Sequence, residues 1–499
     1  MSHAHRTPRR CRTTATTSLV GVIGAGIAGL VAAYELERIG YRVEVLEGSS
    51  RLGGRIRTHR FGAHEGAPFA ELGAMRVPTA HRRTMHYIDH LGLRAHVRPF
   101  TTLLSEENAY LATSTGHVRL RDAPRALMED VRASLAHARH RHRHETVVFG
   151  AWLTAVVDAT APPALRAELR ADLGGKLLDL VEGIDLTPHL HGDSKDRLDV
   201  HGLFTAHPAV RAGCGPRLRS FLDDILTETS PELIRLDCGM DQLIQRLAAR
   251  IRGPVHLGQK VAGLDVGDDH VLVRLGRGPG AGVRRYDYVL CTVPFPVLRG
   301  LELTGFDEDK LAVVREVDYC AATKVAVHCR EPFWEREGIR GGASFSGGRI
   351  RQTYYPAAGG DRAHGAALLA SYTIGDDAEL LGRMPEPLRH QVVIEELARM
   401  HPQLLRPGMV LDVASIAWAE HPWTAGGCAI RWGKDAAACE EQRARAARPQ
   451  KRLFFAGEHC SSEPAWIEGA VESALESVGR IARYEPRHRS RTPVNLEAV

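Results

Sequence analysis

Hydrophobic and polar positions alternate with two different periods along the chain, and the first change between them lies near the amino terminus. Leu19 to Ile23 is a short, mostly branched apolar run that is typical of a buried strand. It leads through Gly24, Gly26 and Gly29 into a pattern of helical spacing, and a second strand-like run follows from Tyr41 to Leu46. Strand, glycine turn, helix and strand in this order predict a parallel α/β unit.

The carboxyl end of the chain shows the same change from strand to helix. Arg452 to Ala456 reads as a buried strand, and apolar residues recur at helical spacing from Ile467 to Ile481. In the middle of the chain, Leu165, Leu169 and Leu173 recur every four residues, which predicts a helical segment. A chain of 499 residues is too long for a single ordinary core, so two or three domains are expected.

The glycine turn near the amino terminus is suited to bind a dinucleotide. Gly24 permits the tight turn, Gly26 lets the backbone approach a pyrophosphate, and Gly29 lets the helix pack closely on the strand. Glu47 ends the second strand about 20 residues further on, where a carboxylate accepts hydrogen bonds from a ribose hydroxyl. An acidic residue at this position disfavours a cofactor with a 2′-phosphate.

Charge and cysteine content narrow the function classes. The net charge of +5 comes from 65 basic and 60 acidic residues, so we expect neither a nucleic acid nor a membrane as partner. The nine cysteines are scattered singly without a CxxC pair, a pattern that predicts neither a metal site nor a disulfide framework. A reducing compartment, the cytoplasm, is the simplest expectation.

Several motifs resemble those of the flavin amine oxidase family. RLGGRIRT (51–58) resembles the RxGGRxxT segment that follows the second strand in this family, and FAGE (455–458) with WIEGA (466–470) resembles its carboxy-terminal flavin motif. CGMDQL (238–243) and DYVLCTVP (287–294) are similar to two further family motifs. From these motifs, which lie between about Leu19 and Arg483, the chain is identified as a member of the family.

The resemblance implies an α/β fold of three parts. A Rossmann-type FAD-binding domain, discontinuous in sequence, would be interleaved with a mixed-sheet substrate domain and would carry an inserted helical domain. The expected segments are a disordered basic arm (1–17), FAD-binding parts (18–75, 231–300 and 421–483), substrate-domain parts (76–121 and 301–420), the helical domain (122–230) and a disordered tail (484–499).

FAD is therefore the expected cofactor. By resemblance, Arg55 would lie by the pyrophosphate, Val261 would contact adenine through its backbone, Glu458 would bind the ribitol and Trp418 would lie beside the isoalloxazine. Trp418 is equally well explained as a core residue. The residues expected to bind FAD are Gly24, Gly26, Gly29, Glu47, Arg55, Met75, Arg76, Val261, Trp418, Gly457, Glu458, Ile467 and Glu468.

Arg76 marks a subgroup of the family. Its segment ELGAMRVP (71–78) looks like the one in which L-amino acid oxidases pair an arginine with the substrate α-carboxylate, and monoamine oxidases have no such arginine. A guanidinium keeps its charge and offers parallel donors to a carboxylate, so an arginine among apolar neighbours predicts an incoming anion. A structural ion pair between Arg76 and Glu71 is the alternative. Tyr372 would meet the same carboxylate, unless it is a buried structural tyrosine.

The remaining catalytic residues are also implied by the resemblance. Lys324 would contact a water on flavin N5, and Trp466 would close the substrate pocket unless it is a core residue. Hydride would pass from Cα to flavin N5, the imine would hydrolyse to a 2-oxo acid and ammonia, and dioxygen would become hydrogen peroxide. Some family members are thought to deprotonate the amine with a histidine on the helical domain, but residues 221–236 contain none, so no base is assigned.

Other readings stay open on the sequence alone. Cys428 stands in a GGC segment that resembles the one whose cysteine is bonded to the flavin 8α carbon in monoamine oxidases, although a free thiol is the alternative. An L-amino acid oxidase using O2 is the main hypothesis. A decarboxylating tryptophan-type monooxygenase, a monoamine oxidase and a non-catalytic flavin-binding scaffold are the alternatives. A homodimer is possible, and the preferred amino acid side chain is not determined.

Overall fold

The computed structural model describes residues 18–64, 66–114, 116–130, 142–192, 195–276, 282–359, 362–430 and 434–484. The arm predicted at 1–17, residues 131–141 of the predicted helical domain and residues 485–499 of the predicted tail lie outside the described residues. Tyr484, assigned to the tail from sequence, is instead the last residue of the carboxy-terminal helix.

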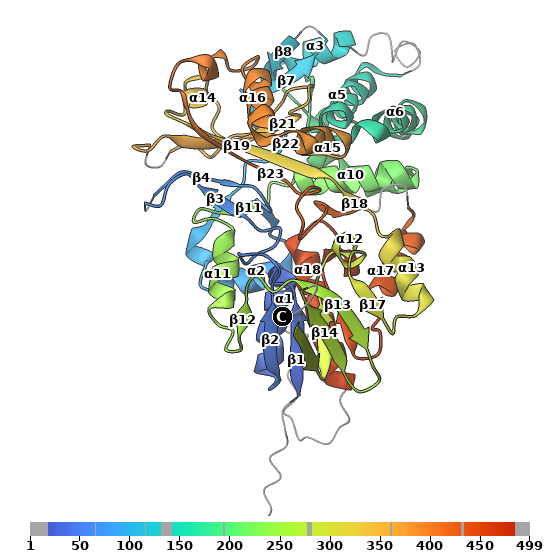
Figure 1. Ribbon diagram of the computed structural model, residues 1–499. Helices are drawn as coiled ribbons and strands as arrows, with labels where there is room; N and C mark the ends of the chain where they lie inside the picture. The colour runs from blue at the N-terminus through green and yellow to red at the C-terminus, as the bar shows by residue number, and fades with distance from the viewer. Residues whose placement is uncertain are drawn as a thin grey trace, which may run out of the picture.

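A parallel five-stranded sheet forms the lower half of the molecule in the view of Figure 1. Its strand order is β12-β2-β1-β16-β25. The strands are β1 (Leu19–Ile23), β2 (Arg42–Leu46), β12 (Val255–His256), β16 (Tyr288–Cys291) and β25 (Leu453–Phe455). Strands from three distant parts of the chain thus meet in one sheet, whose inner strands β1 and β16 are apolar and largely buried between layers.

Helices and a second sheet cover this parallel sheet. Helices α1 (Ile27–Arg38) and α18 (Ile467–Tyr484) share one hydrophobic core with it. The other core lies under a sheet of order β15-β14-β13-β17. The strands of that sheet are β13 (Val261–Val266), β14 (Val271–Leu275), β15 (Gly282–Tyr286) and β17 (Glu302–Thr304). Helices α13 (Glu308–Glu316) and α17 (Ala436–Ala447) lie beside it.

A mixed seven-stranded sheet spans the upper half, with the order β23-β19-β22-β21-β20-β7-β8. The strands are β7 (Tyr110–Thr113), β8 (Gly116–Arg119), β19 (Ala322–Cys329), β20 (Ala343–Phe345), β21 (Gln352–Tyr354), β22 (Ala366–Ile374) and β23 (Val410–Ala417). Antiparallel pairing of β19 with β22 sets Lys324 opposite Tyr372. Two residues that are distant in sequence are therefore neighbours across one ladder.

Helices packed around a leucine-rich core form the inserted domain at the upper right of Figure 1. They are α3 (Ala123–Asp130), α5 (His144–Thr160), α6 (Pro163–Asp172), α7 (Leu178–Glu182), α8 (Val200–Ala206), α9 (Pro208–Gly213) and α10 (Pro216–Glu228). The chain leaves α10 into β11 (Leu233–Leu236), which pairs antiparallel with β5 (Val77–Pro78) and β6 (Val97–Pro99). This pairing returns the chain beside Arg76.

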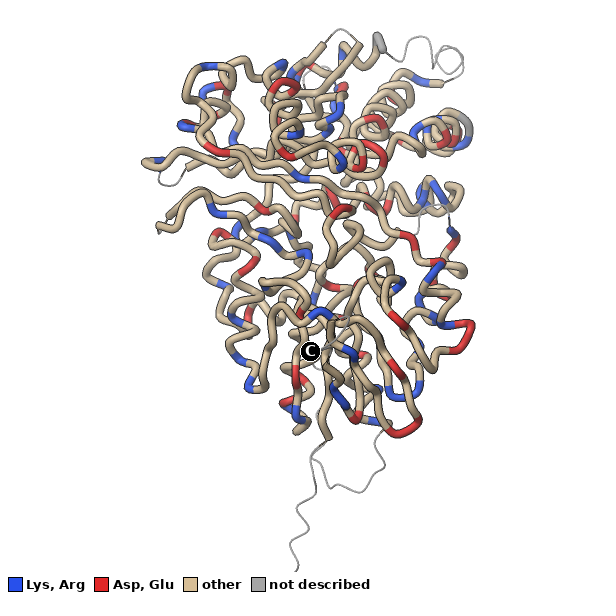
Figure 2. Tube along the Cα trace, viewed as in Figure 1, with Lys and Arg blue, Asp and Glu red and all other residues tan. Residues whose placement is uncertain are grey.

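Shorter elements join these layers. They include β3 (Thr58–Arg60), β4 (Phe69–Glu71), α2 (Arg82–His90), α11 (Asp241–Ala248), β18 (Tyr319–Cys320), α15 (Asp376–Arg383), α16 (Glu386–Leu397) and β24 (Cys428–Ala429). Basic and acidic residues are interspersed over both halves in Figure 2, and many pair locally, as Arg445 does with Asp309 and Glu316. In the described part of the chain, we find no helix long and apolar enough to cross a membrane.

Candidate active site

The glycine turn after β1 leaves an open space in front of the helix that follows. Gly24 has φ +101°, and a Cβ on Gly29 would lie 1.9 Å from the Gly24 carbonyl oxygen, so both positions exclude a side chain. Gly26 differs, because the nearest atom to its ideal Cβ in the described part, apart from chain neighbours, is Gly54 Cα at 4.0 Å. Among described residues no side chain caps α1. The helix N-terminus thus faces a space that fits a pyrophosphate.

Glu47 lies at the edge of this space. Its carboxylate is mostly buried and accepts hydrogen bonds from the backbone N–H groups of Ala25 at 2.7 Å and Ser49 at 2.8 Å. A carboxylate has about four lone-pair positions, so two remain for other donors. The residue lines the cavity, as the predicted contact with a ribose requires.

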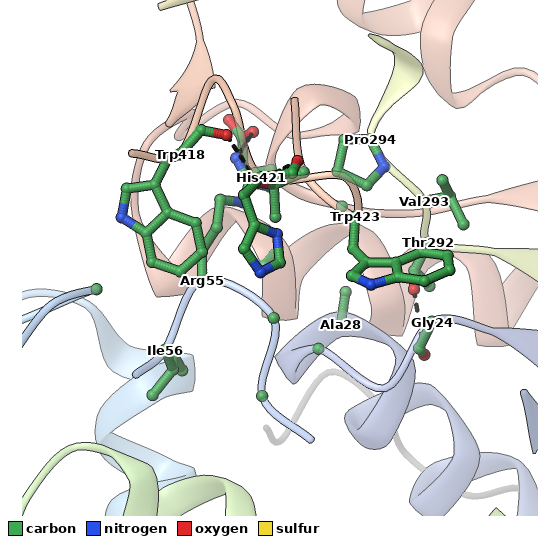
Figure 3. Close-up of a pocket in the computed structure, with 18 of the residues that line it drawn as sticks. Gly24, Ala28, Arg55, Ile56, Thr292, Val293, Pro294, Trp418, His421 and Trp423 are labelled. Atoms are coloured by element: carbon green, nitrogen blue, oxygen red, sulfur yellow. Dashed lines mark hydrogen bonds and ion pairs between the residues drawn. The ribbon is translucent and has the colours of Figure 1, made fainter. Parts of the chain in front are cut away.

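One elongated cavity connects the glycine turn with the seven-stranded sheet. Its lining includes Val261 from β13, Trp418 after β23 and Ile467 at the start of α18, so segments that are distant in sequence contribute to it. Figure 3 shows Trp418, His421 and Trp423 side by side across from the turn at Gly24. An extended cleft with an anion site and an acceptor at one end and aromatic walls further along fits FAD.

A buried ion pair joins the two ends of the sequence in this cavity. Arg55 donates to Glu458 Oε1 at 2.7 Å and to the Gly427 carbonyl oxygen at 2.9 Å. Burial is the largest effect and opposes the charge on Glu458, but Arg55, His459 and the Ala465 backbone N–H together hold the pKa of this carboxyl below its ordinary value. The backbone N–H of Ala465 also donates to Glu458, at 3.1 Å. Both charged side chains are therefore fixed in the cavity wall.

Backbone strain lies next to this pair. Ala465 has φ +68°, in the left-handed region that glycine adopts more easily than alanine. Glycine, which has no side chain, would therefore fit this position just before Trp466 with less strain. Gly457, which directly precedes Glu458, has φ +132° and also requires the conformational freedom of glycine.

Lys324 is the buried base of the cavity. Its ammonium donates to the Gly73 carbonyl oxygen at 2.6 Å and to the Glu71 carbonyl oxygen at 3.3 Å, and it lies 4.7 Å from the centre of the Tyr372 ring. Burial, and after it the nearby charge of Arg76, lower the pKa of Lys324 to about 7. Near neutral pH a large fraction of Lys324 is therefore an uncharged amine.

Trp418 and Trp466 form aromatic walls of the cavity. The indole N–H of Trp418 donates to the Leu72 carbonyl oxygen at 3.0 Å, which fixes the ring plane. Trp466 lines the cavity at the start of α18 and meets the ring of His81 edge-on at 5.2 Å. Both rings thus belong to the cavity wall and also pack against protein.

Arg76 lies beside the cavity but outside its lining among the described residues. Its side chain is only 7% exposed and is held between the rings of Phe100 and Tyr354, whose centres lie 5.6 and 5.7 Å from the guanidinium carbon. Its ion-pair partner is Glu228 of α10, through Nη2, whereas the sequence alternative named Glu71. Nε and Nη1 are buried and have no hydrogen-bond partner in the described part.

Three further residues predicted to bind the cofactor do not belong to the cavity lining in the described part of the chain. Met75 lies in the hydrophobic core that joins the substrate and helical domains. The Glu468 carboxylate turns away from the cavity and accepts from the backbone N–H groups of Arg83 and Thr84, at the start of α2. Gly29 lies behind the turn, where it allows the close packing of α1. Local motif spacing places these residues near FAD but does not fix which way their side chains point.

Comparison with known proteins decides the family. The family model described as flavin containing amine oxidoreductase matches residues 27–482 of the chain. The chain belongs to this family. Its α/β fold, predicted from sequence, is confirmed by solved structures of the same architecture. Putrescine oxidase bound to putrescine is 18% identical, with a TM-score of 0.62 over 94% of this chain and 99% of that chain.

Curated relatives of this flavoenzyme include amino acid oxidases. The flavin-dependent L-tryptophan oxidase RebO of Lentzea aerocolonigenes is 57% identical over 468 residues, which cover 94% of this chain and 98% of the relative. An L-amino-acid oxidase of Mus musculus is 30% identical over 94% of this chain and 71% of the relative. The sequence-based assignment to a flavin-dependent oxidoreductase related to L-amino acid oxidases, with FAD as cofactor, is therefore confirmed.

Sequence reasoning missed several residues of the flavoenzyme's cavity. Thr292, His421 and Trp423 all line it, although only Thr292 lies in a motif recognised beforehand. The ring of Trp423 packs against Gly48, where a Cβ would come within 2.2 Å of the indole. The signal available in the sequence was the second tryptophan, five residues after Trp418 in the same loop. Glu228 gave no such signal, because α10 contains no family motif.

Acid precipitation of the yellow protein is expected to release all of its flavin. Cys428 lines the cavity in β24, opposite Cys320 of β18. Burial raises the pKa of its thiol well above the ordinary value, and the proximity of Cys320 and Glu458 adds to this effect. Since the thiolate is the nucleophile, Cys428 is poorly suited to bond to the flavin. A yellow pellet that turns white in Cys428→Ala would instead show a covalent link.

Proposed function

We propose that this flavoenzyme is an L-amino acid oxidase acting on L-tryptophan or a closely similar aromatic amino acid. The products would be the 2-oxo acid, ammonia and hydrogen peroxide. The observation that carries the proposal is Arg76, a buried guanidinium beside the cavity, two of whose nitrogens have no partner among the described residues. Such a group needs an anion, and an α-carboxylate supplies both the charge and two acceptor oxygens.

Arg76 would orient the substrate through its carboxylate. It is held between Phe100 and Tyr354, which limits the directions from which a carboxylate can approach. Orientation of this kind contributes strongly to rate, because the reacting Cα–H must lie at the flavin. Tyr372 lies close by, since its ring centre is 6.3 Å from that of Tyr354, which packs against the Arg76 guanidinium. These two residues would hold the carboxylate together.

Lys324 would accept and donate protons in the cavity. When bound, FAD supplies the two-electron oxidation of the substrate Cα–N bond and the reduction of dioxygen to hydrogen peroxide. With a pKa lowered to about 7, Lys324 exchanges a proton readily near neutral pH. Two backbone carbonyl oxygens hold its Nζ in place, so a water bound to it would have a fixed position.

An aromatic side chain is favoured by two observations. The relative RebO is named as an L-tryptophan oxidase and matches nearly the full length of the chain. Around Arg76 the rings of Phe100, Tyr354 and Tyr372 form an aromatic surface, with Tyr354 and Tyr372 6.3 Å apart. Aromatic rings pack well against one another, so an indole would be stabilised here.

None of the eight cysteines in the described part forms a disulfide, which supports a reducing compartment such as the cytoplasm as the place of action. A decarboxylating tryptophan monooxygenase would need the same carboxylate site and differs only in its products.

Purified yellow protein is expected to produce hydrogen peroxide with L-tryptophan. Tryptamine and D-tryptophan should be inactive, because the first lacks the carboxylate and the second places Cα–H on the wrong face. A peroxidase-coupled assay against the twenty L-amino acids measures this directly, and mass spectrometry identifies the product. Indole-3-acetamide with carbon dioxide would support the monooxygenase instead, and turnover of tryptamine would support a monoamine oxidase.

A further inference from the structure

The inserted helical domain places a carboxylate of its own on the arginine that we assign to the substrate. Glu228, the last residue of α10, accepts a hydrogen bond from Nη2 of Arg76. Glu228 lies in the segment of the chain to which sequence analysis assigned no function. The contact joins residues 152 positions apart, from two different domains.

Strand pairing makes this contact a fixed feature of the fold. β11 follows α10 after a short turn and pairs with β5, with Leu233 opposite Pro78 and Ile234 opposite Val77. The Thr79 backbone N–H also donates to the Glu232 carbonyl oxygen at 3.1 Å. Arg76 directly precedes β5, so the ladder holds the end of α10 close to the guanidinium.

The geometry of a guanidinium makes Glu228 a competitor for a second carboxylate. A carboxylate binds with two oxygens either to Nε and Nη2 or to Nη1 and Nη2, and both edges include Nη2. Glu228 holds Nη2, while Nε and Nη1 remain unpartnered in the described part. A two-oxygen contact by a substrate therefore requires Glu228 to share or give up this nitrogen.

Burial explains why such a competitor is needed. Arg76 is 7% exposed, and an unpaired buried charge is strongly unfavourable. Glu228 provides the countercharge when no substrate is bound, yet its own side chain is 23% exposed, so it loses less on leaving the pair. A neighbouring hollow, whose lining includes Thr229, Arg121 and Arg197 among apolar residues, lies beside the end of α10.

We propose that Glu228 is a specificity-determining residue that occupies Arg76 in place of the substrate carboxylate and is displaced by it. The inference rests on the proposed function, because it takes Arg76 as the carboxylate site. A ligand with a carboxylate replaces Glu228 and restores the charge balance of Arg76. A ligand without one, such as tryptamine, leaves Glu228 in place and gains no contact with the arginine.

The test uses Glu228→Gln, which keeps the size of the side chain and removes its charge. Glu232→Gln is the matched control, since Glu232 lies four residues along in the same segment, is exposed and hydrogen-bonds Thr79 instead. Indole-3-propionate is the probe, because it carries the carboxylate and the indole but no amine. The FAD-loaded protein is titrated with the probe, and its dissociation constant is determined both from the heat of binding and from the change in flavin absorbance.

Glu228→Gln is expected to bind indole-3-propionate about tenfold more tightly, because the probe no longer competes with an internal carboxylate for a buried charge. KM for L-tryptophan should fall in the same direction with little change in kcat, and Glu232→Gln should resemble the wild type. Unchanged or weaker binding in Glu228→Gln would overturn the inference. If Glu228→Gln does not fold, Glu228→Ala is measured in the same way and is held to the same expectation.

The outcome is separable from that of the proposed function. Binding of indole-3-propionate requires no turnover, so a protein that binds the probe but produces no peroxide from L-tryptophan contradicts the function alone. A protein that oxidises L-tryptophan but binds the probe equally well in wild type and Glu228→Gln contradicts the role of Glu228 alone. If Glu228 held the substrate amine, KM would rise in Glu228→Gln while affinity for the amine-free probe stayed constant.

Discussion

Replacing Arg76 by methionine is expected to raise KM for L-tryptophan by about a hundredfold or more while FAD stays bound. Loss of a buried, charge-assisted contact to a carboxylate costs about 3 kcal/mol, which corresponds to roughly two orders of magnitude in affinity. Among the described residues, Arg76 does not belong to the lining of the cavity assigned to FAD, so the flavin spectrum should be retained. Methionine preserves the length of the buried stem.

Steady-state kinetics with a matched arginine control measure this effect. Arg94 is two-thirds exposed and pairs with Asp89 on the surface, so Arg94→Met removes the same charge without a role in the site. Arg76→Lys keeps the charge but loses the parallel donors, and KM should lie between those of wild type and Arg76→Met. Wild-type KM in Arg76→Met, with full FAD content, would remove Arg76 from the substrate site.

Local sequence patterns were sufficient to predict the first strand, turn and helix of this protein. The strand at Leu19–Ile23, the glycine turn and the helix from Ile27 are encoded by neighbouring residues, and the structure has them at these positions. Lys324 was identifiable because a lysine in an apolar strand needs acceptors, and it finds two carbonyl oxygens. The apolar neighbours of Arg76 likewise predicted that its charge requires an anion as partner.

The partner of Arg76 could not be read from sequence. Glu71 is near it in the chain, but the Glu71 carboxylate accepts from the hydroxyl of Thr58 at 2.8 Å and from the Met240 backbone N–H at 2.8 Å. Strand β4 and the turn before β5 determine where the Glu71 side chain points. The spacing of residues in the sequence does not predict this direction. The actual partner, Glu228, comes from a helical insertion without motifs. Contacts of this kind depend on how domains pack, which periodicity does not specify.

The same substitution at two glycines of one turn is expected to separate cofactor binding from folding. A serine at Gly26 would project into open space, with Gly54 Cα at 4.0 Å the nearest atom to its Cβ in the described part, apart from chain neighbours. Gly26 is the N-cap of α1 with an ordinary φ of −74°, and serine is a favourable N-cap residue. Gly26→Ser should therefore fold normally, yet fill the space that fits the pyrophosphate.

Gly29→Ser is expected to impair folding, whereas Gly26→Ser impairs cofactor binding. Its Cβ would lie 1.9 Å from the Gly24 carbonyl oxygen, so α1 must move away from β1. Overpacking of this kind costs about 3 kcal/mol, and here it involves the backbone of the turn that follows the central strand. We expect a large loss of soluble protein and a lower melting temperature for Gly29→Ser, whether or not FAD is added.

Three measurements on the purified variants distinguish these outcomes. Circular dichroism and thermal unfolding without cofactor report the fold, and titration with FAD reports the affinity. Gly26→Ser should show a wild-type circular dichroism spectrum with an FAD affinity lower by about two orders of magnitude, the effect of losing contacts worth about 3 kcal/mol. A fully yellow Gly26→Ser would mean that the pyrophosphate does not pass over this glycine. Since a single added CH₂OH group is compared at positions three residues apart, differences in side-chain chemistry cannot account for opposite results.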